Sequence, residues 1–282
     1  MHVEVNGTRL WFDVEGAESV PEGRGMRERP VVVLVHGGPA SWDHSYFKPW
    51  FGRLAEVAQV VYLDLRAHGR SARGSEAEWS LEQCADDVRA FCDALGIERP
   101  VVLGHSMGGF VVMLYGARHP GHAAGLVLQS TFARFDLERI VRGFRRVGGD
   151  EVAELARQSY GDEDVSDDEW ALVFRAFGPH VVDPDAMARR MANPDLVERG
   201  FEALQGLDVV DQLARIDVPT LVAAGDLDPI TPVETAREIV AALPPGIARL
   251  EVLEGAGHFP WLDVPDAYWP LLAGFVERPD GR

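Results

Sequence analysis

Residues 100–109, Pro-Val-Val-Leu-Gly-His-Ser-Met-Gly-Gly, contain the pattern that decides the fold. The apolar run at 101–103 predicts a strand that is buried on both faces. The glycines and apolar residues after Ser106 predict a helix over 107–118. Glycines two positions to either side of Ser106 allow a tight, strained turn between the strand and the helix. A serine in that turn projects its hydroxyl above the sheet, beside the positive N-terminus of the helix.

Similar apolar runs alternate with helical patterns along the rest of the chain. Alternating residues around Asn6-Gly7 predict a hairpin, and residues 16–30, rich in Gly, Glu, Pro and Arg, predict a loop. The predicted strands are 3–5, 10–14, 31–35, 60–63, 101–103, 126–128, 221–224 and 250–253. The predicted helices are 47–57, 81–95, 107–118, 233–243 and 265–277. This order favours an α/β fold with a mostly parallel sheet, helices on both faces, and ligands bound beyond the C-terminal ends of the strands.

One long segment interrupts the alternation. Between residues 132 and 216 no buried strand is predicted, and the pattern indicates four or five short helices that start near Asp136, Asp150, Ser166 and Asp183. About 85 residues are too many for a simple connection. We therefore predict a core formed by residues 1–131 and 217–282 and an inserted helical lid formed by residues 132–216.

Composition and charge exclude several classes of partner. The net charge of −18 disfavours binding to nucleic acid or to anionic membrane surfaces. No apolar run approaches the roughly 20 residues that cross a bilayer. Residues 1–5 do not begin a signal peptide, so a cytoplasmic location is expected. The expected partner is a small-molecule or short-peptide substrate, and the oligomeric state stays open.

The cysteines and histidines do not form a metal-binding pattern. Cys84 and Cys92 are eight residues apart in one predicted helix, about 12 Å along its axis, which is too far for a disulfide. Neither has a histidine at a metal-ligand spacing, so both are interpreted as buried thiols. No nucleotide-binding glycine motif follows a predicted strand. We therefore expect no metal and no cofactor.

Two later loops supply the partners that a nucleophilic serine needs. A serine hydroxyl needs a base, and the candidate is His258, in the loop that follows the last predicted strand. The base needs a carboxylate that fixes its tautomer. Asp228 follows the strand at 221–224, and we prefer it to Asp226, which is closer to the strand end and suited to capping the turn. The order Ser, Asp, His is the one used by hydrolases with this kind of serine turn.

The same chemistry needs backbone N–H groups for the developing negative charge. One candidate is the N–H of Met107, directly after the serine. The second is expected from His36-Gly37-Gly38-Pro39, which follows the strand at 31–35. Glycines in that loop allow its backbone to approach a substrate closely. Gly38 is preferred to Gly37 as the donor, and Gly37 is expected to contact the substrate.

Taken together, these motifs resemble the α/β-hydrolase superfamily. The matching stretches are His-Gly-Gly-Pro, Asp-Leu-Arg-Ala-His-Gly-Arg-Ser at 64–71, Gly-His-Ser-Met-Gly-Gly, the Asp228 loop and Gly-Ala-Gly-His at 255–258. The resemblance implies an eight-stranded, mostly parallel sheet and assigns Ser106, Asp228 and His258 as the triad. His-Gly-Gly-Pro is similar to the loop of the proline iminopeptidase-like branch, in which acidic residues of a helical cap hold the free amine of the substrate.

Two positions depart from that branch. Its serine turn usually reads Gly-Gly-Ser-Trp-Gly, whereas Gly-His-Ser-Met-Gly is common among esterases, lactonases and carbon–carbon bond hydrolases. Its glycine loop usually continues with another glycine, whereas Ala40 follows Pro39 here. In the lid, Glu198 and Glu202 are candidates for holding a substrate amine.

Other residues near the predicted site have two interpretations. Asp64 and Arg66 are expected to hold their loop in place, and His36 and His105 to be buried hydrogen-bonding partners. Five aromatic residues either line an acyl pocket or pack in the core: Trp42, Phe110, Phe132, Phe259 and Trp261.

The leading hypothesis for function is a cofactor-free serine hydrolase. It would cleave a small ester, lactone or amide through an acyl-enzyme, and an aminopeptidase of the proline iminopeptidase type is included. The alternatives are a carbon–carbon bond hydrolase, a haloperoxidase-like enzyme on the same triad, and a non-catalytic ligand-binding protein.

Overall fold

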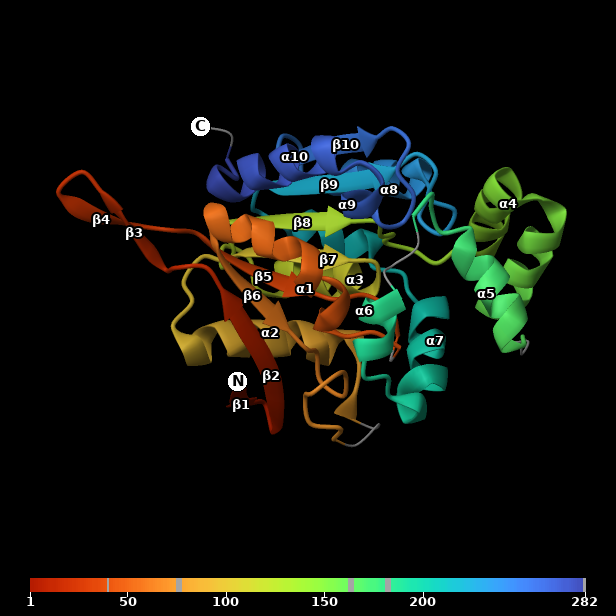
Figure 1. Ribbon diagram of the computed structural model, residues 1–282, viewed down its shortest axis with the longest axis horizontal. Helices are drawn as coiled ribbons and strands as arrows, with labels where there is room; N and C mark the ends of the chain where they lie inside the picture. Colours follow the sequence, from red (N-terminus) through yellow and green to blue (C-terminus); the bar gives the residue numbers. More distant parts are fainter. Residues whose placement is uncertain (40, 75–77, 162–164, 181–183, 281–282) are drawn as a thin grey trace.

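An eight-stranded sheet forms the centre of the molecule, with strand order β1-β2-β6-β5-β7-β8-β9-β10 (Figure 1). The computed structural model describes residues 1–39, 41–74, 78–161, 165–180 and 184–280. The β1–β2 and β2–β6 pairs are antiparallel, and the other neighbouring strands are parallel. The strands are β1 (His2–Val5), β2 (Thr8–Glu15), β5 (Val31–Val35), β6 (Gln59–Leu63), β7 (Val101–His105), β8 (Gly125–Gln129), β9 (Thr220–Gly225) and β10 (Ala248–Leu253). The predicted fold class is confirmed.

Helices cover both faces of this sheet. In β8, Leu126 packs on α3 at Gly116, whereas Gln129, an odd number of residues away and so on the other face, accepts a hydrogen bond from Tyr268 of α10. The core helices are α1 (Lys48–Phe51), α2 (Leu81–Leu95), α3 (Met107–Arg118), α8 (Val233–Ala242), α9 (Pro260–Asp263) and α10 (Pro265–Glu277). Cys84 and Cys92 are buried free thiols on α2, as predicted.

Two local predictions were wrong. Residues 16–30 contain a β-hairpin, β3 (Ser19–Glu22) and β4 (Gly25–Glu28), that extends from the core (Figure 1). Its residues are largely exposed, so no buried face produced an alternating pattern that the sequence could reveal. Residues 47–57 form the short α1 and a 3₁₀ helix, η2 (Gly52–Glu56), instead of one α-helix.

The segment between β8 and β9 is helical. It contains α4 (Leu137–Tyr160), α5 (Asp167–Arg175), α6 (Pro184–Arg189), η4 (Pro194–Leu196), α7 (Val197–Gln205) and η5 (Val210–Arg215). Asp136 and Ser166 cap α4 and α5 as predicted. Gly149 kinks α4 just before the predicted start at Asp150, and the predicted start at Asp183 lies outside the described residues. The C-terminal ends of β8 and β10 point toward the side where α4–α7 lie (Figure 1).

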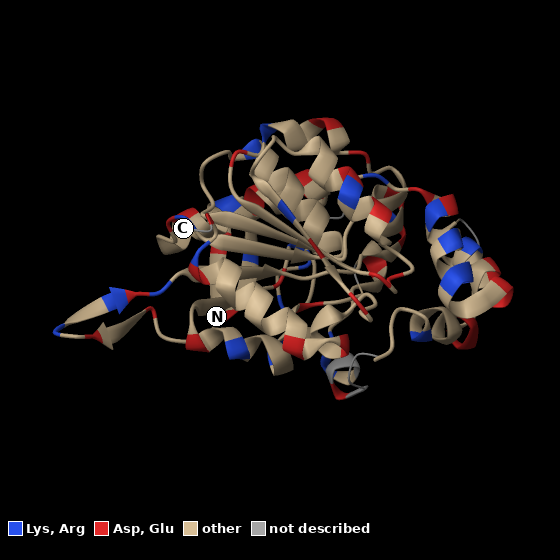
Figure 2. Cartoon of the chain, turned by 90° about the horizontal axis from the view of Figure 1, so that it is seen from above, with Lys and Arg blue, Asp and Glu red and all other residues tan. Residues whose placement is uncertain are grey.

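Charged residues lie on the outer helices and loops, whereas the central strands are mostly uncharged (Figure 2). The strands β5, β7, β8 and β9 are almost entirely buried, which explains their continuous apolar runs. Among the described residues, no helix is both long enough and apolar enough to cross a membrane.

Candidate active site

Ser106 occupies a strained turn between β7 and α3. Its φ of 55° and ψ of −122° lie outside the regions that residues with a side chain usually adopt. The turn closes only because its neighbours are glycines. A Cβ on Gly104 would lie 2.2 Å from the Gly108 carbonyl oxygen, and one on Gly108 would lie 2.2 Å from the Val35 oxygen. The motif therefore has a steric cause, and the predicted strand–turn–helix is confirmed.

His258 and Asp228 form a buried pair. The His258 Nδ1 lies 2.8 Å from Asp228 Oδ2, and both side chains are almost completely shielded from solvent. Oδ1 accepts hydrogen bonds from the N–H groups of Ile230 and Thr231, and Oδ2 accepts one from the Thr231 hydroxyl. Burial alone raises the pKa of Asp228, but His258 and these donors together hold that pKa below 3.8. The carboxylate is therefore kept ionised beside the imidazole.

The competing carboxylate, Asp226, has a different environment. Its Oδ1 accepts a hydrogen bond from the backbone N–H of Gly255, 2.7 Å away, at the start of the loop that carries His258. It is only partly buried. Asp226 therefore holds two loops together by a hydrogen bond to the backbone, and this geometry favours Asp228 as the partner of the histidine.

The backbone of His258 is held as firmly as its ring. Its N–H donates to the carbonyl of Phe177, 2.6 Å away, in the inserted segment. Its carbonyl lies 2.9 Å from Nε2 of His105. Among the described residues, neither Ser106 Oγ nor His258 Nε2 has a hydrogen-bond partner, so both polar atoms are free for a substrate or for each other.

The glycine loop after β5 lies against the serine. A Cβ on Gly37 would lie 2.9 Å from the Ser106 Cβ. The Gly37 N–H already donates to the Tyr46 hydroxyl, 2.7 Å away. Among the described residues the Gly38 N–H has no hydrogen-bond partner, and Gly38 has a φ of 65°. The N–H of Met107, in the first turn of α3, has no acceptor within its helix. This geometry favours Gly38 over Gly37 as the second donor.

Aromatic rings cluster beside the His258 imidazole. The Trp42 ring centroid lies 6.3 Å from that of Phe259, and Phe259 lies 5.3 Å from the His258 ring. Two rings of the inserted segment join them: Phe174 lies 6.0 Å from Trp42, and Phe177 lies 5.6 Å from His258. Sequence reasoning missed Phe174 and Phe177. Together with Trp170 they form a stripe at helical spacing, a signal that the sequence contained.

Phe110 and Phe132 lie away from this cluster, whereas Trp261 borders it, with its ring centroid 5.5 Å from that of Phe259. Phe110 and Phe132 are buried and pack on each other with their centroids 4.8 Å apart. Ring contacts of Phe132 continue to Phe135 and not, among the described residues, to the cluster around His258. Trp261 is buried against His105 and Tyr46.

Among the described residues, the buried carboxylates of Asp43 and Asp64 are hydrogen-bonded to neighbouring loops, and the two carboxylates predicted to hold a substrate amine are not buried. Glu198 and Glu202 are exposed on α7. Asp43, His44 and Asp64 form a group that could in principle hold a metal ion. However, the Asp43 oxygens accept from the N–H groups of Ser45 and Met191, and those of Asp64 accept from His44 and Arg70. These contacts hold loops together, as expected for Asp64.

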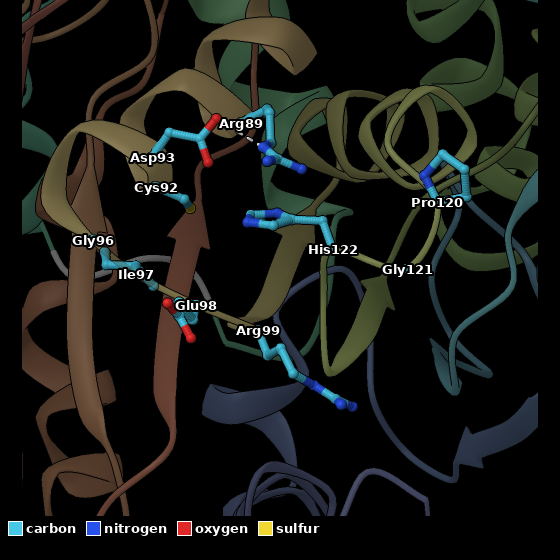
Figure 3. Close-up of a pocket in the computed structure, with 10 residues that line it drawn as sticks. All are labelled: Arg89, Cys92, Asp93, Gly96, Ile97, Glu98, Arg99, Pro120, Gly121 and His122. Atoms are coloured by element: carbon cyan, nitrogen blue, oxygen red, sulfur yellow. Dashed lines mark hydrogen bonds and ion pairs between the residues drawn. The ribbon is translucent and has the colours of Figure 1, made fainter.

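A hollow lies between the end of α2 and the segments that lead into β7 and β8 (Figure 3). It is bordered by Arg89, Cys92 and His122, with Arg99 directed away from its centre. Arg89 and Cys92 lie on α2, and Arg99 and His122 lie shortly before the N-terminal ends of β7 and β8, whereas Ser106 follows the C-terminal end of β7. Parallel strands have their N-terminal ends at one edge of the sheet and their C-terminal ends at the opposite edge. The hollow is therefore separate from the candidate site.

Comparison with known proteins identifies the class. The profile of the α/β-hydrolase fold family matches residues 30–265, so the chain belongs to that family. It is 27% identical to proline iminopeptidase PfmaB of Pestalotiopsis fici, over 98% of this chain and 99% of that protein. It is 29% identical to a monoacylglycerol lipase of Mycolicibacterium smegmatis, over 90% of this chain and 87% of that protein.

A solved structure agrees with the fold. The proline iminopeptidase of Mycobacterium smegmatis superposes with a TM-score of 0.79, covering 99% of this chain and 98% of that one, at 23% identity. The resemblance to the proline iminopeptidase-like branch, inferred from the motifs, is confirmed by the family match and by the relatives that are named proline iminopeptidase.

Proposed function

We propose that the protein is a serine esterase that cleaves a small ester or lactone with an apolar acyl group. The observation that carries the proposal is the buried His258–Asp228 pair together with a strained, glycine-flanked Ser106. Strain at a residue of this kind persists only where the surrounding structure enforces it, which is typical of functional sites.

The geometry supports a two-step acyl transfer. Ser106 Oγ attacks the substrate carbonyl carbon while His258 Nε2 takes the hydroxyl proton. The carbonyl oxygen gains the negative charge and accepts hydrogen bonds from the N–H groups of Gly38 and Met107. The bond to the leaving group then breaks, and His258 returns the proton to it. In the second step His258 takes a proton from water, the hydroxide attacks the acyl carbon, and Ser106 leaves with the proton.

The surroundings favour an apolar acyl group over a peptide amine. The rings of Trp42, Phe174, Phe177 and Phe259 gather beside the triad. An aminopeptidase needs a carboxylate free to hold the ammonium group of its substrate. The two carboxylates proposed for that task, Glu198 and Glu202, are exposed, and the buried ones in the described residues are already hydrogen-bonded.

We further propose that residues 132–216 act as a lid over a core formed by residues 1–131 and 217–282. The segment contacts the histidine loop, the aspartate loop and the glycine loop. Phe177 accepts a hydrogen bond from the His258 N–H, and Arg146 donates to the Asp226 carbonyl, 2.6 Å away. Gly200 packs so closely on Pro39 of the glycine loop that a Cβ there would lie 2.4 Å from the proline Cβ.

A substrate panel tests the proposal. We expect p-nitrophenyl acetate and butyrate to be hydrolysed, a proline arylamide not to be, and a fluorophosphonate to label the protein at Ser106. The control is Ser106→Ala, which should fold but neither label nor turn over. Turnover of proline p-nitroanilide faster than of the esters would instead support an aminopeptidase, as the name of the Pestalotiopsis fici relative suggests. Absence of labelling in folded protein would contradict a serine hydrolase of any kind.

A further inference from the structure

A chain of buried hydrogen bonds runs behind the candidate site and joins its three loops. The Gly37 N–H lies 2.7 Å from the Tyr46 hydroxyl, which lies 3.0 Å from Nδ1 of His105. Nε2 of His105 lies 2.9 Å from the carbonyl oxygen of His258. Tyr46, His105 and His258 are each at most 3% exposed. The chain therefore connects the glycine loop, the serine turn and the histidine loop out of contact with water.

The chemistry of these groups fixes the direction of every hydrogen bond. The His258 carbonyl can only accept, so Nε2 of His105 carries the proton. Burial, together with the neighbouring His258, holds the pKa of His105 well below 6.5, so its ring is neutral and Nδ1 has a free lone pair. Tyr46 must then donate its proton to Nδ1. The remaining lone pair of the Tyr46 oxygen accepts the Gly37 N–H.

A second histidine holds the other side of Gly37. The N–H of Leu65 lies 3.2 Å from Nε2 of His36, so Nε2 accepts and Nδ1 carries the proton. Nδ1 lies 3.0 Å from the carbonyl oxygen of Gly37. The peptide bond between Gly37 and Gly38 is trans, as are the others in the described residues. Its C=O and N–H therefore point in opposite directions, and a bond that holds the oxygen also aims the Gly38 N–H.

We propose that Tyr46 and His36 are positioning residues that hold the Gly38 N–H as an oxyanion donor. His105 ties that arrangement to the backbone of His258. The inference rests on the proposed serine chemistry and adds the residues that set its geometry. Neither Tyr46 nor His36 has to touch the substrate for this role. A correctly placed Gly38 N–H stabilises the carbonyl oxygen only when that oxygen becomes an anion. Loss of the hydrogen bonds that hold the Gly38 N–H should therefore lower kcat and leave KM nearly unchanged.

The first test is Tyr46→Phe, which keeps the ring and removes the hydroxyl. We expect kcat for a p-nitrophenyl ester to fall about 10- to 100-fold, since a donor displaced by a fraction of an ångström loses much of its effect. KM should stay within about twofold, and the pH at which kcat/KM is half-maximal should not move, since the His258–Asp228 pair is intact. The affinity for a trifluoromethyl ketone, which forms an oxyanion on Ser106, should fall by the same factor as kcat.

The matched control is Tyr115→Phe. Tyr115, on α3, is also a buried tyrosine bonded to a histidine, but that histidine is His122, which borders the hollow of Figure 3. Its loss should lower thermal stability without changing kcat. Equal kcat in Tyr46→Phe and Tyr115→Phe would overturn the proposal that Tyr46 positions the Gly38 N–H. Failure of the unmodified protein to label with fluorophosphonate would instead overturn the proposed function, so the two failures are distinguishable.

A second pair of variants keeps the test valid if Tyr46→Phe folds poorly. His36→Asn places an amide N–H near the position of Nδ1, whereas His36→Ala removes that donor. Both lose the bond from Leu65, so the structural cost is shared. We expect kcat to fall in His36→Ala as in Tyr46→Phe, and to stay within about threefold of the parent in His36→Asn. Equal kcat in the two His36 variants would contradict the proposal.

Discussion

Replacing Asp228 by asparagine should disable the protein through the tautomer of one histidine. The N–H groups of Ile230 and Thr231 donate to Oδ1, so the asparagine oxygen must stay at that position. Its NH₂ group then replaces Oδ2 and faces His258 Nδ1 at about the present 2.8 Å. Two donors cannot face each other, so the His258 proton moves to Nε2. An Nε2 that carries a proton cannot accept the one from Ser106.

The expected loss follows from that change of tautomer. In a serine protease the same substitution costs about 10⁴ in kcat, which corresponds to about 5 kcal/mol of transition-state stabilisation. We expect a similar fall in kcat for hydrolysis of p-nitrophenyl acetate, with KM nearly unchanged. Circular dichroism and thermal unfolding should show that the variant is folded.

Asp226→Asn is the matched control for this experiment. An asparagine oxygen can still accept the Gly255 N–H that Asp226 now binds, so kcat should change by less than about threefold. A fall of less than tenfold for Asp228→Asn would refute the reasoning. So would a larger loss in Asp226→Asn than in Asp228→Asn, because it would move the acid to Asp226.

Three further outcomes are expected from the structure. Burial lowers the pKa of His105 and lowers that of His68 to about 3; both are neutral when folded, so the unfolded chain binds protons first as pH falls below 6.5. The free energy of unfolding in urea should therefore decrease below that pH, and His68→Gln should reduce the slope by about 1.4 kcal/mol per pH unit; an unchanged slope would contradict the shift. Gly257→Ala would place a Cβ 2.3 Å from the Phe177 carbonyl oxygen. The kcat of this variant in the ester assay should fall at least about tenfold, and an unchanged kcat would show that the site tolerates the added methyl group. Gly108→Ala should destabilise the fold in thermal unfolding, whereas Gly274→Ala, with nothing within 4 Å of the new Cβ, should stabilise it by about 0.5–1 kcal/mol; equal melting temperatures would argue against the steric account of the serine turn.

Most of the core architecture could be predicted from the sequence because its signals are local. Buried strands produce continuous apolar runs, and α2 and α3 begin and end where the helical patterns of the sequence indicated. The exposed hairpin at 19–28 could not be predicted from the sequence. Neither of its faces is buried, so no periodicity distinguishes it from a loop.

The sequence by itself determined which residues reach the candidate site. Ser106, Asp228 and His258 each follow a strand of a parallel sheet, and parallel strands bring their C-terminal ends to one edge. Connectivity and strand order are enough for that inference. They also limit the carboxylate to two neighbouring residues in one loop, Asp226 and Asp228.

Only the tertiary structure decided how those residues are held. The N–H of Gly37 is already bound because Tyr46 reaches into the glycine loop, whereas that of Gly38 has no partner among the described residues. His105 meets the carbonyl of a residue 153 positions away. Phe177 reaches His258 from the inserted segment. Such contacts join segments that are remote in the sequence, and each depends on how whole helices and loops pack, which no local pattern records.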